Sequence, residues 1–267
     1  MSVAVGPFAL SWGHILFFVA YFIALFVGWR VGRRNNVSVE PVLTRMLIVG
    51  LIVARAVFVV SYWGEYSADL LGILDLRDGG FSLFGGVAGS LLVAVYYLWR
   101  KPAMRIALTS AMSAAVAVWL TSVVVYDTIR ASQVLPDQQY QTLAAEPVML
   151  SKFNDKPIVI NLWATWCPPC RREMPVFMQA QQQRSDVNFV FINQGEYGYS
   201  VANYLQSEQL SLFNMLLDPK QLTMRQLGAQ GLPSTLFYTA DGVLAHSHMG
   251  ELSEASLNHA LKKIAPR

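Results

Sequence analysis

Charged residues are scarce in this chain of 267 residues. Only 14% of the residues are charged, whereas an ordinary soluble domain has about 25%. Hydrophobic residues make up 54% of the chain, and they are concentrated in blocks. A charge deficit of this size is unusual for a wholly soluble protein and indicates segments that span a membrane.

A strongly basic surface is missing as well. Residues 1–130 hold 10 Lys/Arg and 6 Asp/Glu, whereas residues 131–267 hold 10 and 11, so the net charge of +3 comes from the first half. The basic residues of that half stand at the ends of apolar blocks, where membrane topology explains them. The sequence therefore predicts no nucleic-acid partner.

Cysteine and histidine are both rare, with two of the former and four of the latter. Cys167 and Cys170 are too close in sequence for a structural disulfide that closes a loop, and their spacing suits a redox pair or half of a zinc site. A structural zinc site needs about four ligands, and among the histidines only His246 and His248 share one face of a predicted strand. We therefore expect no metal site.

Four apolar blocks fill the first half of the chain, and each is long enough to cross a bilayer as a helix. We expect them to form a transmembrane helical domain over residues 1–127. No Lys or Arg precedes the first block, which argues against a secretory signal. The expected spans lie at about residues 3–29, 42–63, 81–99 and 104–126.

The charges between the blocks predict an orientation. By the positive-inside rule, loops rich in Lys and Arg face the cytoplasm, so both ends of this domain are expected on the outer side. The acidic loop at 64–80 agrees with that orientation. Six of the ten basic residues of this half lie in the two predicted cytoplasmic loops: Arg30, Arg33, Arg34, Arg100, Lys101 and Arg105.

The second half is of a different kind. Residues 128–147 are polar and are interpreted as a linker, and residues 148–267 alternate short β-rich runs with helical patterns. The sequence thus predicts a multi-domain protein, an α-helical membrane domain followed by an α/β domain with helices on both faces of a small sheet. Strands are expected at 157–163, 187–192, 213–217, 234–239 and 243–249, and helices at 168–183, 201–208, 221–227 and 253–264.

The cysteine pair stands where a predicted strand turns into a predicted helix. The N–H groups at a helix N-terminus favour an anion, so Cys167 is expected to react as a thiolate. Pro168 and Pro169 suit the first helical turn, and Arg171 and Arg172 add positive charge nearby. Cys167 would attack a disulfide in a client protein, and Cys170, one turn further, would resolve the mixed disulfide.

Residues 163–175, with the letters WATWCPPCRREMP, resemble the active-site segment of the TlpA/ResA/DsbE-like branch of the thioredoxin family. The resemblance covers about residues 145–265. It implies a mixed central sheet with helices on both faces, an enzyme for thiol–disulfide exchange, and no cofactor beyond a redox-active Cys167–Cys170 disulfide. In thioredoxin itself the strand before the cysteines carries a buried aspartate, and Asn161 stands at that position here.

The same resemblance implies further site residues. Glu173 occupies the place of a glutamate that exchanges a proton with the second cysteine, although a solvated acid favoured by the helix dipole would look the same in sequence. Glu196 is a second-rank candidate. In the segment 231–235 (GLPST), Pro233 matches the cis-proline that faces the cysteines. The residues expected to bind the client are Trp166, Pro168, Pro169 and Leu232.

The membrane half carries a weaker resemblance, over about residues 10–125. The glycine-rich stretch 78–89 (DGGFSLFGGVAG), together with 53–58 (VARAVF), resembles prolipoprotein diacylglyceryl transferase. Phe84 stands where that family has a histidine, and the family's later glycine/arginine/asparagine signature finds no match. Because phenylalanine cannot move a proton, we expect no acyl transfer.

Three residues of this half remain candidates for a lipid or partner site, namely Arg55, Gly85 and Gly86. An arginine inside a span is costly and is a functional hypothesis by default. Arg55 could instead pair with Asp69 or Asp75, or extend its charged end to the interface. The glycines could instead allow two spans to pack closely.

These observations predict a multi-pass protein of the bacterial inner membrane, with its thioredoxin-like domain in the periplasm, that reduces disulfides of client proteins. Cytochrome c maturation factors are one class of expected client. The four spans contain no cysteine, so a separate membrane protein must donate the electrons. One alternative is a lipid-handling protein, similar to the diacylglyceryl transferase, with an accessory redox domain. The other is a binding module that only docks a partner.

Overall fold

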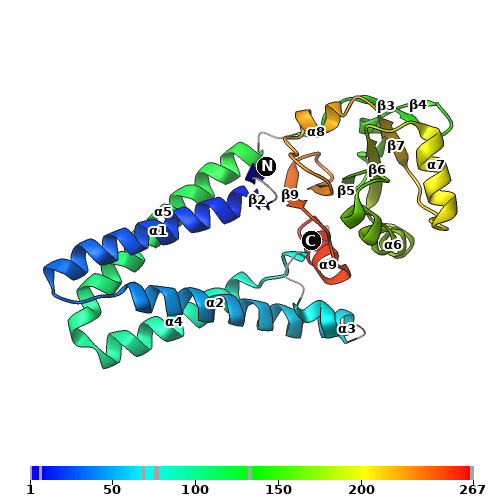
Figure 1. The fold of residues 1–267 in the computed structure, drawn as a ribbon. Coiled ribbons are helices and arrows are strands. Elements are labelled where there is room, and N and C mark those ends of the chain that lie inside the picture. The colour runs from blue at the N-terminus through cyan, green and yellow to red at the C-terminus, as the bar shows by residue number, and fades with distance from the viewer. Residues whose placement is uncertain (1, 6–7, 68–69, 75–77, 132–133, 265–267) are drawn as a thin grey trace. The chain divides into compact units, whose positions relative to one another are not determined.

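The computed structural model describes residues 2–5, 8–67, 70–74, 78–131 and 134–264. The chain divides into two compact units (Figure 1). The helical unit comprises residues 13–126, and the α/β unit comprises residues 1–12 together with 127–267. Each unit is described by itself below.

Four long apolar helices make up the helical unit. Each is long and hydrophobic enough to cross a membrane, which agrees with the four blocks of the sequence. Short helical turns connect them: α3 (Trp63–Tyr66), η1 (Leu70–Leu74) and η3 (Pro102–Met104). The long helices are α1 (Trp12–Arg34), α2 (Glu40–Ser61), α4 (Leu83–Arg100) and α5 (Arg105–Ala131).

The first helix begins later than the expected span at 3–29. Strands β1 (Ser2–Val5) and β2 (Phe8–Ser11) precede it and pair with each other in antiparallel fashion. Hydrophobic composition alone does not distinguish such a hairpin from the start of a helix. The Gly-Pro pair at positions 6 and 7 is a turn signal between the two strands.

A seven-stranded mixed sheet forms the centre of the α/β unit, in the order β4-β3-β7-β6-β5-β8-β9. Strands β5, β6 and β7 are parallel, and the other neighbours are antiparallel. This confirms the predicted mixed sheet. The strands are β3 (Gln139–Thr142), β4 (Pro147–Met149), β5 (Ile158–Trp163), β6 (Asn188–Gln194), β7 (Met215–Asp218), β8 (Ser234–Tyr238) and β9 (Leu244–Met249).

The central strand β5 separates two hydrophobic cores, because alternate residues of a strand point to opposite faces. Val159 and Trp163 belong to the core beneath α6 (Pro168–Gln183), α7 (Gly198–Ser207) and α9 (Glu254–Leu261). Ile158, Ile160 and Leu162 belong to the opposite core, which also contains residues of η4 (Leu150–Phe153) and a residue packed from α8 (Leu222–Gln226). Asn161 therefore points toward the face that α6 covers.

The α/β fold starts earlier than the expected boundary at residue 148. Strand β3 lies inside the segment interpreted as a linker, and it pairs with both β4 and β7. Only Tyr140 of its four residues is buried, so the strand reads as polar in sequence. Pairing with distant strands, rather than hydrophobic patterning, determines this element.

Candidate active site

Cys167 and Cys170 are joined by a disulfide at the start of α6. Cys167 is the N-cap of that helix, and its Sγ accepts a hydrogen bond from the backbone N–H of Cys170 at 3.3 Å. Pro168 and Pro169 fill the first helical turn, where a missing N–H costs nothing. The strand-to-helix placement expected from the sequence is confirmed.

The two sulfurs differ in their access to solvent. The Cys167 residue is 3% exposed and Cys170 is 0% exposed, so a bulky partner reaches Cys167 first. Trp166, directly before Cys167, is 63% exposed, whereas Trp163 lies in the core against Tyr204. Of the two tryptophans in the motif, Trp166 is the one available to contact a client.

Glu173 lies on α6 one turn beyond Cys170 and is completely buried. Its Oε1 accepts a hydrogen bond from Asn161 Nδ2 at 2.8 Å, and its Oε2 accepts one from the backbone N–H of Leu252 at 3.1 Å. Burial raises the pKa of the Glu173 carboxyl to about 8, although both hydrogen bonds favour the charged form. The alternative of a solvated first-turn acid is therefore wrong.

Asn161 links Glu173 to the strand on its other side. Its Nδ2 also lies 3.1 Å from Thr235 Oγ1, on β8. The parallel and antiparallel neighbours of β5 hold this side chain in the sheet, and α6 brings Glu173 onto it. The sequence identified both positions separately, but it gave no sign that the two side chains touch.

Glu196 supports the loop that leads into the cysteine motif. Its Oε2 accepts hydrogen bonds from the backbone N–H of Thr165 at 2.7 Å and from Asn193 Nδ2 at 2.8 Å. The Thr165 hydroxyl donates to the other carboxylate oxygen. Glu196 thus fixes the backbone two residues before Cys167. Sequence reasoning missed Thr165 and Asn193, whose roles depend on this contact.

Arg171 and Arg172 are both engaged with acids, which changes the expected charge around the cysteines. Arg171 forms an ion pair with Glu208, and Arg172 forms one with Glu251, each at 2.6 Å. The sequence predicted that the two arginines add positive charge near Cys167, and these pairs offset that charge. Any stabilisation of a Cys167 thiolate must come chiefly from the helix N-terminus.

Pro233 precedes β8, and the Leu232–Pro233 peptide bond is cis, as the resemblance implies. Pro233 is buried and Leu232 is partly buried. The Pro233 carbonyl accepts the N–H of Gly250, which ties this turn to the end of β9. The catalytic role of Pro233 and the client contact of Leu232 stay predictions.

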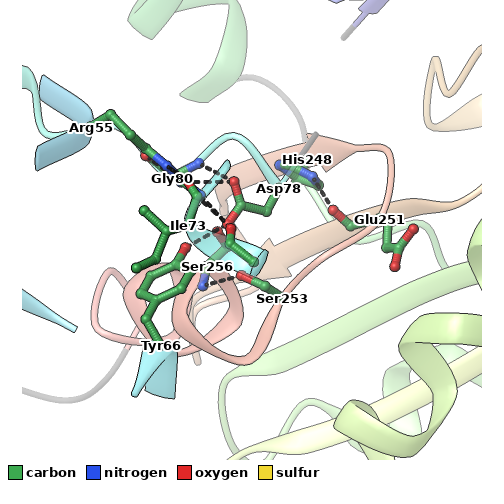
Figure 2. Close-up of polar contacts among 10 residues, drawn as sticks. Arg55, Tyr66, Ile73, Asp78, Gly80, His248, Glu251, Ser253 and Ser256 are labelled. Carbon is green, nitrogen blue, oxygen red and sulfur yellow. Dashed lines mark hydrogen bonds and ion pairs between the residues drawn. The ribbon is translucent and has the colours of Figure 1, made fainter. Parts of the chain in front are cut away.

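In the candidate lipid site of the helical unit, Arg55 is bonded to protein groups. Figure 2 shows the Arg55 guanidinium surrounded by protein acceptors. It donates to the carbonyls of Ile73, Gly72 and Gly80 and forms a 3.0 Å ion pair with Asp78. The suggested partners Asp69 and Asp75 lie outside the described residues.

This arrangement fastens the loop after α2 back onto the helix. Tyr66 donates its hydroxyl hydrogen to Asp78 Oδ2 at 2.6 Å, so the ion pair is itself held in place (Figure 2). A side chain at Gly85 would lie 2.9 Å from the Cβ of Val57, which shows that Gly85 allows close packing of α4 on α2. Arg55 and Gly85 therefore have structural roles, and Gly86 also lies at this helix pair.

A cysteine pair at the start of a helix, in a mixed sheet with a cis-proline turn, defines the thioredoxin-like thiol–disulfide oxidoreductases. Comparison with known sequences specifies the type. Residues 130–261 match the family model for redoxin, and this part of the chain is a redoxin domain related to the ResA and YneN proteins. Residues 1–125 match the family model for prolipoprotein diacylglyceryl transferase.

Two curated relatives illustrate the first match. The thioredoxin-like protein YneN of Bacillus subtilis is 29% identical over 139 residues, which are 50% of this chain and 79% of the relative. The thiol-disulfide oxidoreductase ResA of Bacillus subtilis is 27% identical over 122 residues, which are 45% of this chain and 67% of the relative.

Solved structures also resemble this chain. A thiol:disulfide interchange protein from Chlorobium tepidum is 25% identical, with a TM-score of 0.44 over 49% of this chain and 95% of that one. DsbF of Mycobacterium tuberculosis is 22% identical, with a TM-score of 0.45 over 48% and 96%.

Proposed function

We propose that this chain is a membrane-anchored reductase of protein disulfides that works on the outer side of the bacterial inner membrane. The observation that carries the proposal is the asymmetry of the cysteine pair. Cys167 is 3% exposed and caps a helix, whereas Cys170 is 0% exposed and lies one turn from a buried acid. That arrangement suits an attacking thiolate and a resolving thiol.

The reaction starts from the reduced domain. The Cys167 thiolate attacks one sulfur of a client disulfide, forms a Cys167–client mixed disulfide, and releases the other client sulfur as a thiolate. The exposed Trp166 lies beside Cys167 and offers an apolar surface to the client chain. Pro168 and the neighbouring Pro169 and Leu232 complete the surface we assign to client binding.

Resolution of the mixed disulfide needs a thiolate at Cys170. Glu173 in its carboxylate form accepts the proton from the Cys170 thiol, and the resulting thiolate attacks Cys167 Sγ. The second client sulfur then leaves, so that two electrons have passed to the client and the domain holds its own disulfide. Because the pKa of Glu173 is raised to about 8, the acid can both take and return a proton near neutral pH.

A further cycle requires reduction of that disulfide. The helical unit has no cysteine of its own, so we assign the electron supply to a separate membrane protein with exchangeable thiols. The four apolar helices hold the domain at the bilayer. Clients with disulfides, including cytochrome c maturation factors, are the proposed substrates.

Replacement of Cys170 by serine tests the proposed order of attack. The Cys170→Ser chain should accumulate a covalent adduct with its clients, because no second thiol can displace them. Non-reducing gel electrophoresis of acid-quenched cells should show bands of higher mass that disappear with dithiothreitol. The double variant Cys167→Ser/Cys170→Ser is the matched control and should show none. An adduct-free Cys170→Ser chain would contradict a resolving role for Cys170.

Labelling of intact spheroplasts tests the proposed orientation. A membrane-impermeant maleimide should reach the reduced cysteines of the wild-type chain without permeabilisation. The matched control is Ser38→Cys in the Cys167→Ser/Cys170→Ser background, because Ser38 is exposed in the loop between α1 and α2. That chain should react only after the membrane is opened. The reverse pattern would place the redoxin domain in the cytoplasm.

A lipid-handling function is the second candidate, supported by the match of residues 1–125 to the diacylglyceryl transferase family. Two observations count against it. Phe84 stands at the position of the family's histidine, and the guanidinium of Arg55 is used by the carbonyls and the carboxylate around it. We therefore assign anchoring, rather than acyl transfer, to the helical unit.

A further inference from the structure

The side-chain amide of Asn161 is fully buried between Glu173 and Thr235. Its nitrogen and its oxygen differ in their hydrogen-bond partners. Nδ2 approaches Glu173 Oε1 at 2.8 Å and Thr235 Oγ1 at 3.1 Å. Oδ1 has no hydrogen-bond partner among the residues that the structure describes. A buried acceptor without a partner is unusual in a protein interior.

This arrangement suits only one protonation state of Glu173. A carboxylate accepts hydrogen bonds, so the NH₂ group of Asn161 is the right neighbour for it. A protonated Glu173 carries an O–H on Oε1, because Oε2 stays bonded to the N–H of Leu252. Two donors would then face each other, which costs free energy in a buried site.

A half-turn of the amide removes that conflict. The two ends of an asparagine side chain have nearly the same shape, so the turn needs no extra room. Oδ1 would then accept the O–H of Glu173 and the hydroxyl hydrogen of Thr235, since a threonine hydroxyl both donates and accepts. Each orientation of Asn161 makes two hydrogen bonds.

We propose that Asn161 is a positioning residue whose amide turns end for end as Glu173 gains or loses its proton, so that both forms of the acid keep a partner. This inference rests on the proposed function, in which Glu173 takes the proton of the Cys170 thiol and later returns it. No electron moves in that step. One S–H bond is broken and one O–H bond is formed, and the amide turn accompanies the transfer.

Other charged and polar groups around Glu173 also influence its pKa. Glu251, in the loop before α9, raises the pKa of Glu173 further by repulsion, and it is paired with Arg172. His248 Nε2 lies 3.3 Å from the carbonyl oxygen of Glu251, and Cys167 and Cys170 are joined by a disulfide and do not titrate in that form. The backbone N–H of Leu252 donates to Oε2 and favours the charged form of Glu173.

The direct test follows the amide itself in the full-length chain in detergent micelles. Nuclear magnetic resonance of the ¹⁵N-asparagine-labelled protein, with ¹³C-labelled glutamate, should show the Asn161 NH₂ signals moving between two limiting positions. Their midpoint should coincide with that of the Glu173 carboxyl carbon. In the Glu173→Gln chain the Asn161 signals should stay at one position at all pH values. Asn161 NH₂ signals that keep one position while Glu173 titrates would overturn the proposal.

Substitution provides an independent readout. In Asn161→Leu both forms of Glu173 lose their partner, so the pH midpoint of thiol alkylation should shift by much less than about one unit, the rise expected on losing a fixed donor to the carboxylate. The same substitution in a Glu173→Gln background should leave the pH profile unmoved. Gln194→Met is the matched control, because Gln194 is also a buried amide of the sheet but donates only to the carbonyl of Ile192 among the described residues.

Asn161→Asp provides a second variant, since thioredoxin itself carries aspartate at this position. Two buried carboxyls cannot both ionise easily, so its alkylation profile should split into two steps. An unsplit profile would show that position 161 is not coupled to Glu173, and an Asn161→Leu midpoint raised by about one unit would show a fixed donor. Either result would overturn the proposal. Insulin reduction by the same wild-type sample separates the two claims. If insulin is not reduced, the proposed function is refuted. If insulin is reduced but the Asn161 NH₂ signals do not move with pH, only this inference is refuted.

Discussion

The Cys167→Ser chain is expected to reduce insulin no faster than the uncatalysed reaction, a loss on the order of a thousandfold or more. The physical reason is access. Cys170 is 0% exposed and cannot reach a client disulfide, so no second nucleophile substitutes for Cys167. The measurement is the turbidity of insulin with dithiothreitol as electron donor, using the full chain in detergent.

The substitution should preserve α6, because serine is a favoured N-cap residue and Cys167 is the N-cap of that helix. The control compares the thermal unfolding of the Cys167→Ser chain with that of the Cys170→Ser chain, which also lacks the disulfide. The oxidised wild-type chain provides the reference. Insulin reduction at the wild-type rate by Cys167→Ser would refute the assignment of the cysteine pair as the working site.

The Glu173→Gln chain is expected to be more stable than the wild type at pH 8, by up to several kcal/mol, and similar to it near pH 5. The pKa of Glu173 is raised from 4.5 to about 8 by burial, so the folded protein holds a proton that the unfolded chain releases above pH 4.5. The free energy of unfolding therefore falls as pH rises between these values, by on the order of 5 kcal/mol over the window. A glutamine has no charged form and escapes this loss.

Urea-dependent pulse proteolysis of the oxidised full chain, repeated from pH 5 to pH 8, measures this difference. The matched control is Glu208→Gln, which removes an acid that is partly exposed and paired with Arg171. Its stability should follow the pH dependence of the wild type. Parallel wild-type and Glu173→Gln profiles would show that Glu173 titrates near its ordinary pKa.

Local sequence signals predicted the elements that carry the chemistry. The helix after the cysteines was expected at 168–183, and α6 spans Pro168–Gln183. Its bounds could be predicted because two prolines stand at its start, a strand of β-branched residues precedes it and one of its faces is apolar. The last helix was expected from residue 253, and α9 begins at Glu254 with Ser253 as its N-cap, whose side chain accepts the N–H of Ser256.

The parts that sequence could not reveal depend on contacts between distant segments. Glu251 and Glu208 neutralise the two arginines after the motif, although they follow them by 79 and 37 residues. The contact of Asn161 with Glu173 likewise requires that a helix lie across a particular face of the sheet. Neither composition nor periodicity specifies which side chains meet across such packing.

In the helical unit the sequence left two interpretations of Arg55. Arg55 within an apolar helix could have been a ligand for a head group or a structural residue. Its acceptors, Asp78 and the carbonyls of Gly72 and Gly80, all come from the loop after α2. Only the fold of that loop shows that the guanidinium is already satisfied by protein.

The unequal exposure of the two sulfurs also bears on damage by peroxide. An oxidant from solvent meets Cys167 and converts its thiolate to a sulfenic acid, while Cys170 stays protected behind it. The buried thiol then condenses with the sulfenic acid, water leaves, and the ordinary disulfide is restored. A single oxidant molecule thus yields a state that the normal electron donor can repair, and the irreversible sulfinic and sulfonic acids are avoided.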